Sequence, residues 1–228
     1  MIEHTKEGDL HLVTMRTNSI CSEWQRQMLD VLDIVEADCG KGAALVLTGV
    51  DKSFCNGLNL EEVMKLSPEE MKPFGENMSR IHSRLLVLPC PTVAAMNGHA
   101  FAGGAFMALS LDYRLMREDR GWFCVSEVDV GVPIPAAMMA MLRAKLPANT
   151  ARDAVLTGKR YTADEAIAAG IADGKASMEE LMDSARELAG QLATKEPGIF
   201  GTLKQTWFGP IVDGLVASSS SKPPCPQG

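Results

Sequence analysis

The sequence predicts an α/β protein built around one main core. Short apolar runs with strand character alternate with longer segments whose apolar residues recur at helical spacing, which favours a mixed fold over an all-helical one. Prolines and glycines separate these segments, as expected for the ends of helices and strands. With 228 residues and 46% hydrophobic content, the chain is long enough to bury one full core with a small appendage.

The first third of the chain predicts a βαβ unit. Residues 10–16 alternate between apolar and polar side chains, which is typical of a strand. Residues 22–38 have the spacing of an amphipathic helix, and residues 43–48 predict a short buried strand. A strand, a helix and a second buried strand in this order favour a parallel pair joined by a helical crossover.

The middle of the chain continues the same alternation. Residues 69–88 predict a longer helix, which two prolines end, and residues 92–96 predict a second buried strand. A glycine-rich turn then opens another helix. Residues 113–116 and 122–125 predict two more short strands, separated by a charged turn, and we expect the sheets to end there.

Downstream of the predicted strands the sequence is helical. Two capping boxes indicate helix starts, one at Thr162 with Glu165 and one at Ser177 with Glu180. The C-terminal residues are rich in glycine, serine and proline, a composition typical of disorder. The sequence therefore predicts a core over residues 1–195 and a short, partly disordered C-terminal segment over residues 196–228.

Composition argues against several classes of function. The net charge is -7 and the sequence pI is about 5.2, which disfavours nucleic acid as a partner because phosphate binding needs clustered lysine and arginine. The six cysteines are scattered without a CxxC pair, and no apolar signal segment opens the chain, so we expect a reducing compartment. No apolar run approaches the ~20 residues of a membrane span, and the dispersed histidines predict no metal site.

Two glycine-containing segments and one glutamate carry the candidate chemistry. Residues 53–60 and residues 97–104 are the two segments, and the second ends in Gly103-Gly104 at the start of a predicted helix. Glycine lets the backbone approach a ligand, and the free amides at a helix start attract negative charge. A purely structural turn is the alternative for Gly103-Gly104 taken alone. Glu127 follows the last predicted strand and is the candidate acid or base.

Together these residues resemble the crotonase superfamily, also called the enoyl-CoA hydratase/isomerase family, over residues 10–173. The resemblance implies a crotonase-like spiral of ββα and βαβ turns with C-terminal helices. It also implies that the backbone amides of Leu58 and Gly103 form an oxyanion hole for a thioester oxygen and that Glu127 moves protons. The family usually has Ala-Asp where this chain has Leu58-Asn59, a change expected to alter the acyl pocket more than the backbone hole.

The number of carboxylates implied at the site points to the reaction. Hydratases of this family use a second glutamate, and the corresponding position here is Phe106. One carboxylate is enough to move a proton from C2 to C4, so the resemblance implies an isomerase that converts 3-enoyl-CoA to trans-2-enoyl-CoA in the β-oxidation of unsaturated fatty acids. Residues 98–145 are most similar to plant peroxisomal Δ3,Δ2-enoyl-CoA isomerases. Enoyl-CoA hydration, thioester hydrolysis and a non-catalytic acyl-CoA-binding or scaffold role remain the alternatives.

The same resemblance implies the ligands and partners. Coenzyme A would enter as part of the fatty acyl-CoA substrate, with no separate cofactor, and the chain would form a homo-oligomer, a trimer by family. The peroxisome is the implied compartment; because the sequence ends in Pro-Gln-Gly and not in a Ser-Lys-Leu signal, the cytoplasm is the alternative. The residues expected to contact the substrate are Lys52, Ser53, Asn56, Gly57, Asn59, Leu60, Gly104 and Phe106.

Some residues with suggestive chemistry are assigned structural roles. We expect His99 to be structural and Cys55 to be no nucleophile, because no general base accompanies it. Asp129 is the first candidate for a second acid if hydration occurs. We expect Val125, Val128 and Val130 to exclude water from Glu127 and raise its pKa. Several methionines are expected to fill the core: Met64, Met71, Met138, Met139 and Met141.

Overall fold

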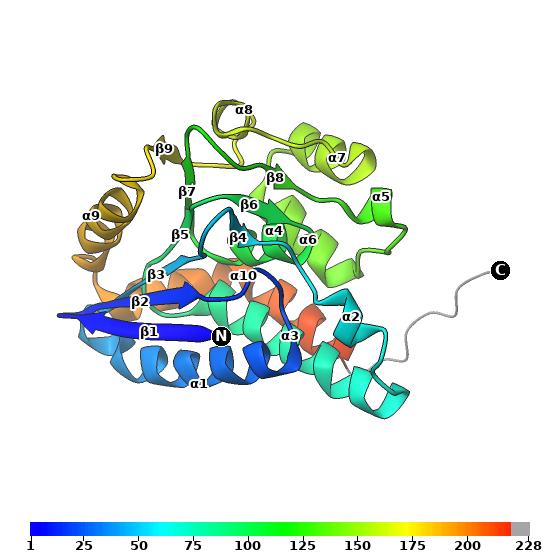
Figure 1. The fold of residues 1–228 in the computed structure, drawn as a ribbon. Helices are drawn as coiled ribbons and strands as arrows, with labels where there is room; N and C mark the ends of the chain where they lie inside the picture. The colour runs from blue at the N-terminus through cyan, green and yellow to red at the C-terminus, as the bar shows by residue number, and fades with distance from the viewer. Residues whose placement is uncertain (220–228) are drawn as a thin grey trace.

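The computed structural model describes residues 1–219 and confirms the α/β class. One sheet has six strands in the order β1-β2-β3-β5-β7-β9, and a smaller sheet has three in the order β4-β6-β8. Helices surround both sheets (Figure 1). The six-stranded sheet consists of β1 (Ile2–Glu7), β2 (Leu10–Met15), β3 (Ala44–Thr48), β5 (Thr92–Met96), β7 (Tyr113–Arg117) and β9 (Gly174–Ala176). The smaller sheet consists of β4 (Ser53–Cys55), β6 (His99–Phe101) and β8 (Phe123–Cys124).

The predicted βαβ unit is present. Strands β2 and β3 pair in parallel, and α1 connects them with a buried stripe that includes Trp24, Met28 and Leu32. Strand β1 was not predicted; it forms an antiparallel hairpin with β2 through a turn at Gly8, whose φ of 62° lies in the left-handed region that favours glycine. The helices are α1 (Ser22–Asp38), η1 (Cys39–Lys41), α2 (Leu60–Val63), α3 (Pro68–Val87), α4 (Gly103–Ser110), α5 (Glu127–Val130), α6 (Ala136–Lys145), α7 (Ala148–Thr157), α8 (Ala163–Ala168), α9 (Leu181–Ala193) and α10 (Pro197–Ser219).

Both faces of the six-stranded sheet are covered. On one face α9 packs its small and apolar residues, among them Leu181 and Ala185, against Val46 and Val93. The opposite face contributes Leu45 and other residues to the larger core, which also contains buried residues of α1, α3 and α4. Because both faces of the sheet are covered, β3 and β5 are buried throughout and mostly apolar, without alternation.

Strand β9 and the start of α9 differ from the sequence-based prediction. The prediction that the sheets end with residues 122–125 is wrong, because β9 adds a parallel edge strand beside β7. The capping box at Thr162 and Glu165 begins α8. At the second site Ser177 Oγ accepts the amide of Glu180 at 3.2 Å, but in the turn before α9, whose N-cap is Glu180.

The C-terminal helix is the largest departure from expectation. The sequence predicts a short, partly disordered segment over residues 196–228, whereas α10 covers Pro197–Ser219 and packs against α3 and α6. Its buried residues include Phe208 and Leu215 in the main core. Residues 220–228 lie outside the described residues. The predicted disorder falls mainly on those residues. Within α10, Phe208, Ile211, Val212 and Leu215 pack against the core, whereas Leu203 and Trp207 are 62% and 71% exposed, so apolar residues do not form a single stripe along the helix.

Candidate functional site

The three strands of the smaller sheet bring the predicted site residues to one edge. Strands β4 and β6 pair in parallel, and so do β6 and β8, so their carboxyl ends meet. Leu58 follows β4, Gly103 follows β6, and Glu127 follows β8, each within three residues of its strand. Ligands of parallel sheets bind beyond the carboxyl ends of the strands. The fold therefore places these three residues where a ligand would lie, although they are far apart in sequence.

Glu127 is a buried carboxylate on the first turn after β8. It begins α5, and only 8% of its surface is exposed. Its Oε2 is buried and is the one carboxylate oxygen of residues 1–219 found buried without a hydrogen-bond partner. Burial raises the pKa of Glu127 above its ordinary value, and a backbone hydrogen bond offsets part of this. A carboxylate with a raised pKa and a free oxygen can take up and return a proton near neutral pH.

The shielding of Glu127 differs from the expectation. Val125 is buried, but Val128 and Val130 are 50% and 59% exposed, so these two do not keep water from the carboxylate. The residues follow a helical turn, which directs them away from the face that buries Glu127. Asp129 on the same turn is exposed, and its carboxylate lies against Gly158. Asp129 therefore points to α7 and away from the position expected of a second acid.

The amides of Leu58 and Gly103 lie close together. A Cβ built on Gly103 would lie 3.7 Å from the Leu58 nitrogen and 3.2 Å from the Gly57 Cα. Ile20 bonds to the residues on either side of Leu58, donating its amide to Gly57 and accepting that of Asn59, which directs the Leu58 amide to the other side. Neither the Leu58 nor the Gly103 amide has a protein acceptor within residues 1–219. Two adjacent free amides can bind an anionic oxygen.

Two glycines permit this approach of the β4 and β6 loops. Gly104 packs so closely against β4 that a Cβ there would lie 1.9 Å from the carbonyl oxygen of Cys55. Gly57 has a φ of 90°, and a Cβ on it would lie 3.0 Å from the Gly103 nitrogen. Only glycine fits either position without moving the backbone. Gly57 and Gly104 thus allow the two loops to approach each other. Packing within the chain explains both glycines without a bound substrate.

Ala102 connects β6 to α4 in a strained conformation. It has a φ of 48° and a ψ of -119°, a region that residues with a side chain rarely adopt. Its amide donates to Cys124 at 3.0 Å, which ties the turn to β8. The strain turns the chain sharply, so that the Gly103 amide begins a helix at the edge where β8 leads to Glu127. Nothing in the residue type of Ala102 indicated this conformation.

Phe106 is buried one turn into α4, with 3% of its surface exposed. Its carbonyl accepts the hydroxyl of Ser110 at 2.9 Å, and Ser110 also pairs with the buried His82 at 2.7 Å. Burial lowers the pKa of His82 to about 4, so this imidazole is neutral at physiological pH. The phenyl ring offers no group that could hold or activate a water molecule.

The predicted substrate-contacting residues in and around the loop from β4 to α2 divide into two groups. Lys52, Ser53 and Asn59 line an open hollow of about 820 Å³. Arg16 and His99 line the same hollow, and no sequence pattern indicated Arg16. Asn59 also caps α2 by accepting the Glu62 amide at 3.2 Å.

Asn56 and Leu60 do not line that hollow. Both are exposed. The Asn56 amide donates to the Asn18 carbonyl at 2.6 Å, and Leu60 begins α2. The residues of the loop from β4 to α2 thus face more than one side of the loop, and the substrate contacts predicted for them remain predictions.

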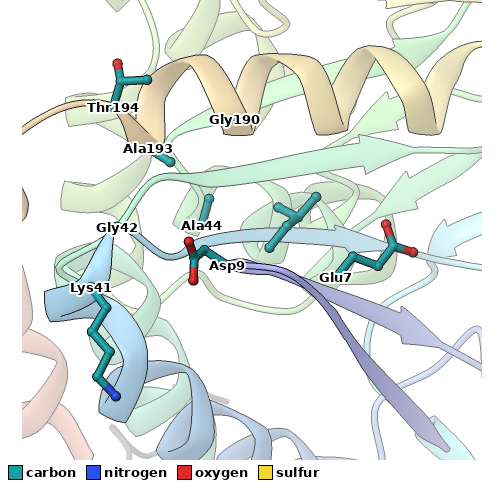
Figure 2. Close-up of a pocket in the computed structure, with 9 residues that line it drawn as sticks. Glu7, Asp9, Lys41, Gly42, Ala44, Gly190, Ala193 and Thr194 are labelled. Atoms are coloured by element: carbon teal, nitrogen blue, oxygen red, sulfur yellow. The ribbon is translucent and has the colours of Figure 1, made fainter.

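A second hollow lies elsewhere. It has a volume of about 470 Å³ and is lined by side chains from the β1–β2 turn, η1 and α9, including Glu7, Asp9 and Lys41 (Figure 2). None of the predicted site residues lines it. Its charged side chains are exposed, and we assign it no role.

The residues to which the sequence assigned structural roles follow that expectation only in part. Cys55 is buried, and burial raises its thiol pKa to about 11, so it remains protonated. His99 stacks against Phe101 and lies 5.0 Å from the ring of Trp122. The prediction that methionines fill the core is wrong for Met64 and Met71, which are 79% and 39% exposed, whereas Met141 is fully buried.

Within residues 1–219 no three histidine, cysteine, aspartate or glutamate side chains are grouped so as to hold a metal ion. In the same part of the chain, no helix combines the length and the apolar character needed to cross a membrane.

Comparison with known proteins gives one consistent result. The family model described as enoyl-CoA hydratase/isomerase matches residues 10–217. In Arabidopsis thaliana, "Enoyl-CoA delta isomerase 3" is 34% identical, with 89% of this chain and 90% of the relative covered, and "Enoyl-CoA delta isomerase 2, peroxisomal" is also 34% identical, with 84% of each covered. A "Short-chain-enoyl-CoA hydratase" of Clostridium acetobutylicum is 29% identical, with 84% of this chain and 75% of the relative covered.

A solved structure supports the same fold. An enoyl-CoA hydratase/isomerase family protein from Pseudomonas syringae superposes with a TM-score of 0.88 at 26% identity, covering 96% of this chain and 95% of its own. The spiral with C-terminal helices that the sequence resemblance implied is therefore present.

Proposed function

The chain belongs to the enoyl-CoA hydratase/isomerase family, and from this premise we propose that it is an isomerase that moves the double bond of a 3-enoyl-CoA to the trans-2 position. The observation that carries this proposal is the single buried carboxylate of Glu127, with its unpartnered Oε2, at the edge where the Leu58 and Gly103 amides are free. Isomerisation requires one proton carrier and one site for negative charge, and the proposal assigns these roles to Glu127 and to the two free amides.

The reaction would proceed in two proton transfers. The Glu127 carboxylate takes the proton from C2, and the electron pair of that C–H bond delocalises over the thioester carbonyl and the C3–C4 double bond. The amides of Leu58 and Gly103 stabilise the negative oxygen, each donor contributing about 3 kcal/mol to the transition state. Glu127 then returns the proton to C4, which leaves the double bond between C2 and C3. Atoms and charge balance without a further reactant.

The raised pKa of Glu127 suits both steps. A carboxylate with an ordinary pKa would release a proton readily but accept one weakly, and burial shifts this balance toward acceptance. The proton stays on the enzyme between the two transfers because the carboxyl group is mostly removed from water.

Hydration of a 2-enoyl-CoA is the second candidate, since relatives with hydratase names share the fold. Hydration needs a second group to position the attacking water. Phe106 supplies no such group, and Asp129 points toward Gly158. Both observations favour isomerisation over hydration.

The remaining parts of the proposal concern ligand, assembly and compartment. The substrate is a fatty acyl-CoA whose nucleotide portion occupies the hollow lined by Lys52 and Ser53, and no other cofactor takes part. We propose a homo-oligomer, which sedimentation velocity would test. A relative named as peroxisomal supports the peroxisome as compartment; fractionation of the source cells would distinguish this from the cytoplasm.

The deciding experiment follows the product. Purified protein is incubated with 3-hexenoyl-CoA, and the formation of trans-2-hexenoyl-CoA and of 3-hydroxyhexanoyl-CoA is measured by chromatography. The proposal expects the first product and not the second, and it expects Glu127→Gln to reduce the rate to background. Equal rates for both proteins would remove Glu127 from the reaction, and accumulation of the hydroxy product from trans-2-hexenoyl-CoA would show a hydratase.

A further inference from the structure

Two histidines join the first two strands of the six-stranded sheet. His4 on β1 and His11 on β2 bond through their ring nitrogens, with 3.0 Å between His4 Nε2 and His11 Nδ1, and the rings stack with 5.2 Å between their centroids. His11 is fully buried and His4 is half-buried. Such a bond needs one nitrogen that carries a hydrogen and one that accepts it. A single added proton leaves an acceptor at the contact, whereas a proton on both rings removes it.

The pair lies among positive charges. The strand register places Lys6 directly opposite His11, and like charges in that position destabilise a sheet. Among residues 1–219, Asp38 at the end of α1 is the carboxylate in ion-pair contact with His11, at 3.4 Å from its Nε2, and it already pairs with Lys6 at 2.7 Å and with Lys41 on η1 at 3.5 Å. Lys6 and Asp38 are the charged side chains that act on the two rings from β1 and α1. Two protonated histidines would therefore bring four positive charges around one carboxylate.

Burial also opposes the protonation of both rings. It lowers the pKa of His4 and of His11 below the ordinary value, Lys6 lowers both further, and Asp38 offsets part of this effect. The folded state therefore binds these protons less tightly than the unfolded chain does. The stability that the neutral pair contributes is fully present above the unfolded pKa of about 6.5 and is lost as the pH falls through the lowered folded pKa values.

Strand β1 has few other attachments. It is the edge strand of the sheet and lies beside α1 (Figure 1), and of its side chains only those of Ile2 and His4 are half-buried. Besides its pairing with β2, the strand is held by the Ile2 amide, which donates to Gln27 at 2.9 Å. Ion pairs between largely exposed side chains, such as Glu7 with Arg186, contribute little each. Loss of the His4 contact would therefore remove one of the two inward-facing side chains that hold the strand.

The same strand adjoins the basic hollow. The carbonyl of Met1, just before β1, accepts the Arg16 amide at 2.7 Å, and Glu3 on β1 forms an ion pair with the Arg16 guanidinium. Met1 and Arg16 line the hollow of about 820 Å³ together with Lys52. The position of β1 therefore determines how Arg16 is held at the hollow.

We propose that His4 and His11 form an acid-sensitive latch, which opens when both rings carry a proton, releases β1 from the edge of the sheet and thereby weakens the binding of an anionic ligand in the hollow. The inference rests on the proposed function for the identity of this ligand, the nucleotide portion of an acyl-CoA. With β1 released, Met1 no longer lines the hollow and Glu3 no longer orients Arg16 toward a phosphate. The affinity for the substrate therefore falls between about pH 7 and about pH 5.

The binding test compares two pH values. Calorimetry gives the Kd of hexanoyl-CoA, a saturated ligand that binds without turnover, at about pH 7.5 and about pH 5.5. We expect the wild-type Kd to rise on acidification at least about tenfold more than that of His4→Phe, which keeps a ring against His11 but takes up no proton. Thr5→Phe is the matched control, because Thr5 is exposed on the same strand, and it should follow the wild type. An equal rise of Kd in the wild type and in His4→Phe would overturn the inference.

A second variant changes the charge beside the latch. Asp38→Asn removes the carboxylate that offsets the positive charges, so the closed latch tolerates protons less and should open about one pH unit higher than in the wild type. Hydrogen exchange of the β1 amides in the protein without ligand, corrected for the intrinsic exchange rate, measures this opening. An opening that moved to lower pH in Asp38→Asn would also overturn the latch.

Exchange and binding together separate the latch from the proposed reaction. On acidification of the wild type, the protection of residues 2–7 should fall at least about tenfold, whereas that of β3 should not change. A pH-dependent protection and Kd in a protein that isomerises no substrate would retain the latch and reject the isomerase. Isomerisation together with pH-independent protection of β1 would retain the isomerase and reject the latch. Loss of protection with an unchanged Kd would reject the link between the latch and the hollow.

Discussion

The molecule contains two sets of buried charged side chains, which differ in whether they have ionic partners. Where α10 meets the core, Lys204 pairs with Asp112 at 2.9 Å, and the backbone amide of Arg114 donates to Asp173 at 2.8 Å. Lys204 and Arg114 are 6% and 5% exposed, and both have ionic partners. At the edge of the smaller sheet, Glu127 is equally buried, but its Oε2 has no partner among the described residues.

The difference separates stability from chemistry. A buried charge with partners is costly to disturb but has no free group with which to react. A buried carboxylate without a partner costs the fold free energy, because burial opposes its ionisation, and it keeps a free oxygen for a substrate. Changes at the first set should therefore affect unfolding and leave the reaction intact, whereas changes at Glu127 should do the reverse.

The largest expected effect is on catalysis. Glu127→Gln should lower kcat for 3-hexenoyl-CoA by roughly 10²–10⁴-fold, the usual contribution of a general base, with an unchanged melting temperature or a small increase. The matched control is Asp129→Asn, which removes the neighbouring exposed carboxylate on the same turn and should keep kcat within about threefold. A large loss in Asp129→Asn with little loss in Glu127→Gln would reverse the assignment of the two acids.

The next largest effect is on stability. Lys204→Met should lower the free energy of unfolding by about 3 kcal/mol, because it leaves Asp112 buried without its ion pair. The kcat of the folded protein should stay within about twofold, since α10 does not contribute a site residue. Urea unfolding measures the free energy of unfolding, and a steady-state assay measures kcat. The exposed Lys195, just before α10, gives the control Lys195→Met, expected to change stability by less than about 0.5 kcal/mol.

A glycine in the site should affect both properties. A Cβ at Gly104 would lie 1.9 Å from the Cys55 carbonyl, so Gly104→Ala must push β4 away from α4, at a cost of about 1–3 kcal/mol of stability. The movement would also separate the Leu58 and Gly103 amides and lower kcat. Gly190→Ala in α9 is the control: nothing lies within 4 Å of that Cβ, and it should raise stability by about 0.5–1 kcal/mol. Full activity in Gly104→Ala would show that the amide pair is not required.

Much of the fold could be predicted because its signals are local. The prolines that follow α3 and the mostly apolar run of β5 lie within a few residues of the elements that they define. Strands β4 and β6 have three residues each, too few for a periodic pattern, and they exist because they pair across the chain. Helix α10 was missed because its glycines and proline disfavour a helix and its apolar residues lie on all sides, whereas packing on α3 decides the structure.

The site shows the same limit. Gly103 and Glu127 could be found because the segments around them resemble a known family. The strained backbone of Ala102 and the presence of Arg16 in the hollow depend on contacts between distant segments, which the residue types do not report. Val128 and Val130 were expected to be buried; an apolar side chain in a sequence does not reveal on which face of a short helix it will lie.

The smallest expected effect is a dependence of stability on pH. Burial raises the folded-state pKa of Glu127 above the value in the unfolded chain, so the folded state binds this proton more tightly. The contribution of Glu127 to stability is therefore fully present below the unfolded pKa and is lost as the pH rises through the folded pKa. Glu127→Gln carries no such proton and should be slightly more stable than the wild type at pH 7, with the advantage vanishing near pH 4. Urea unfolding at both pH values measures this difference in stability.

The same ionisation should make kcat/KM fall as the pH drops through the raised pKa, because the base must be unprotonated to take the C2 proton. If the wild type lost stability relative to Glu127→Gln on acidification instead, the carboxyl pKa would be lowered by a partner, and Glu127 would belong with the paired charges of Asp112 and Lys204.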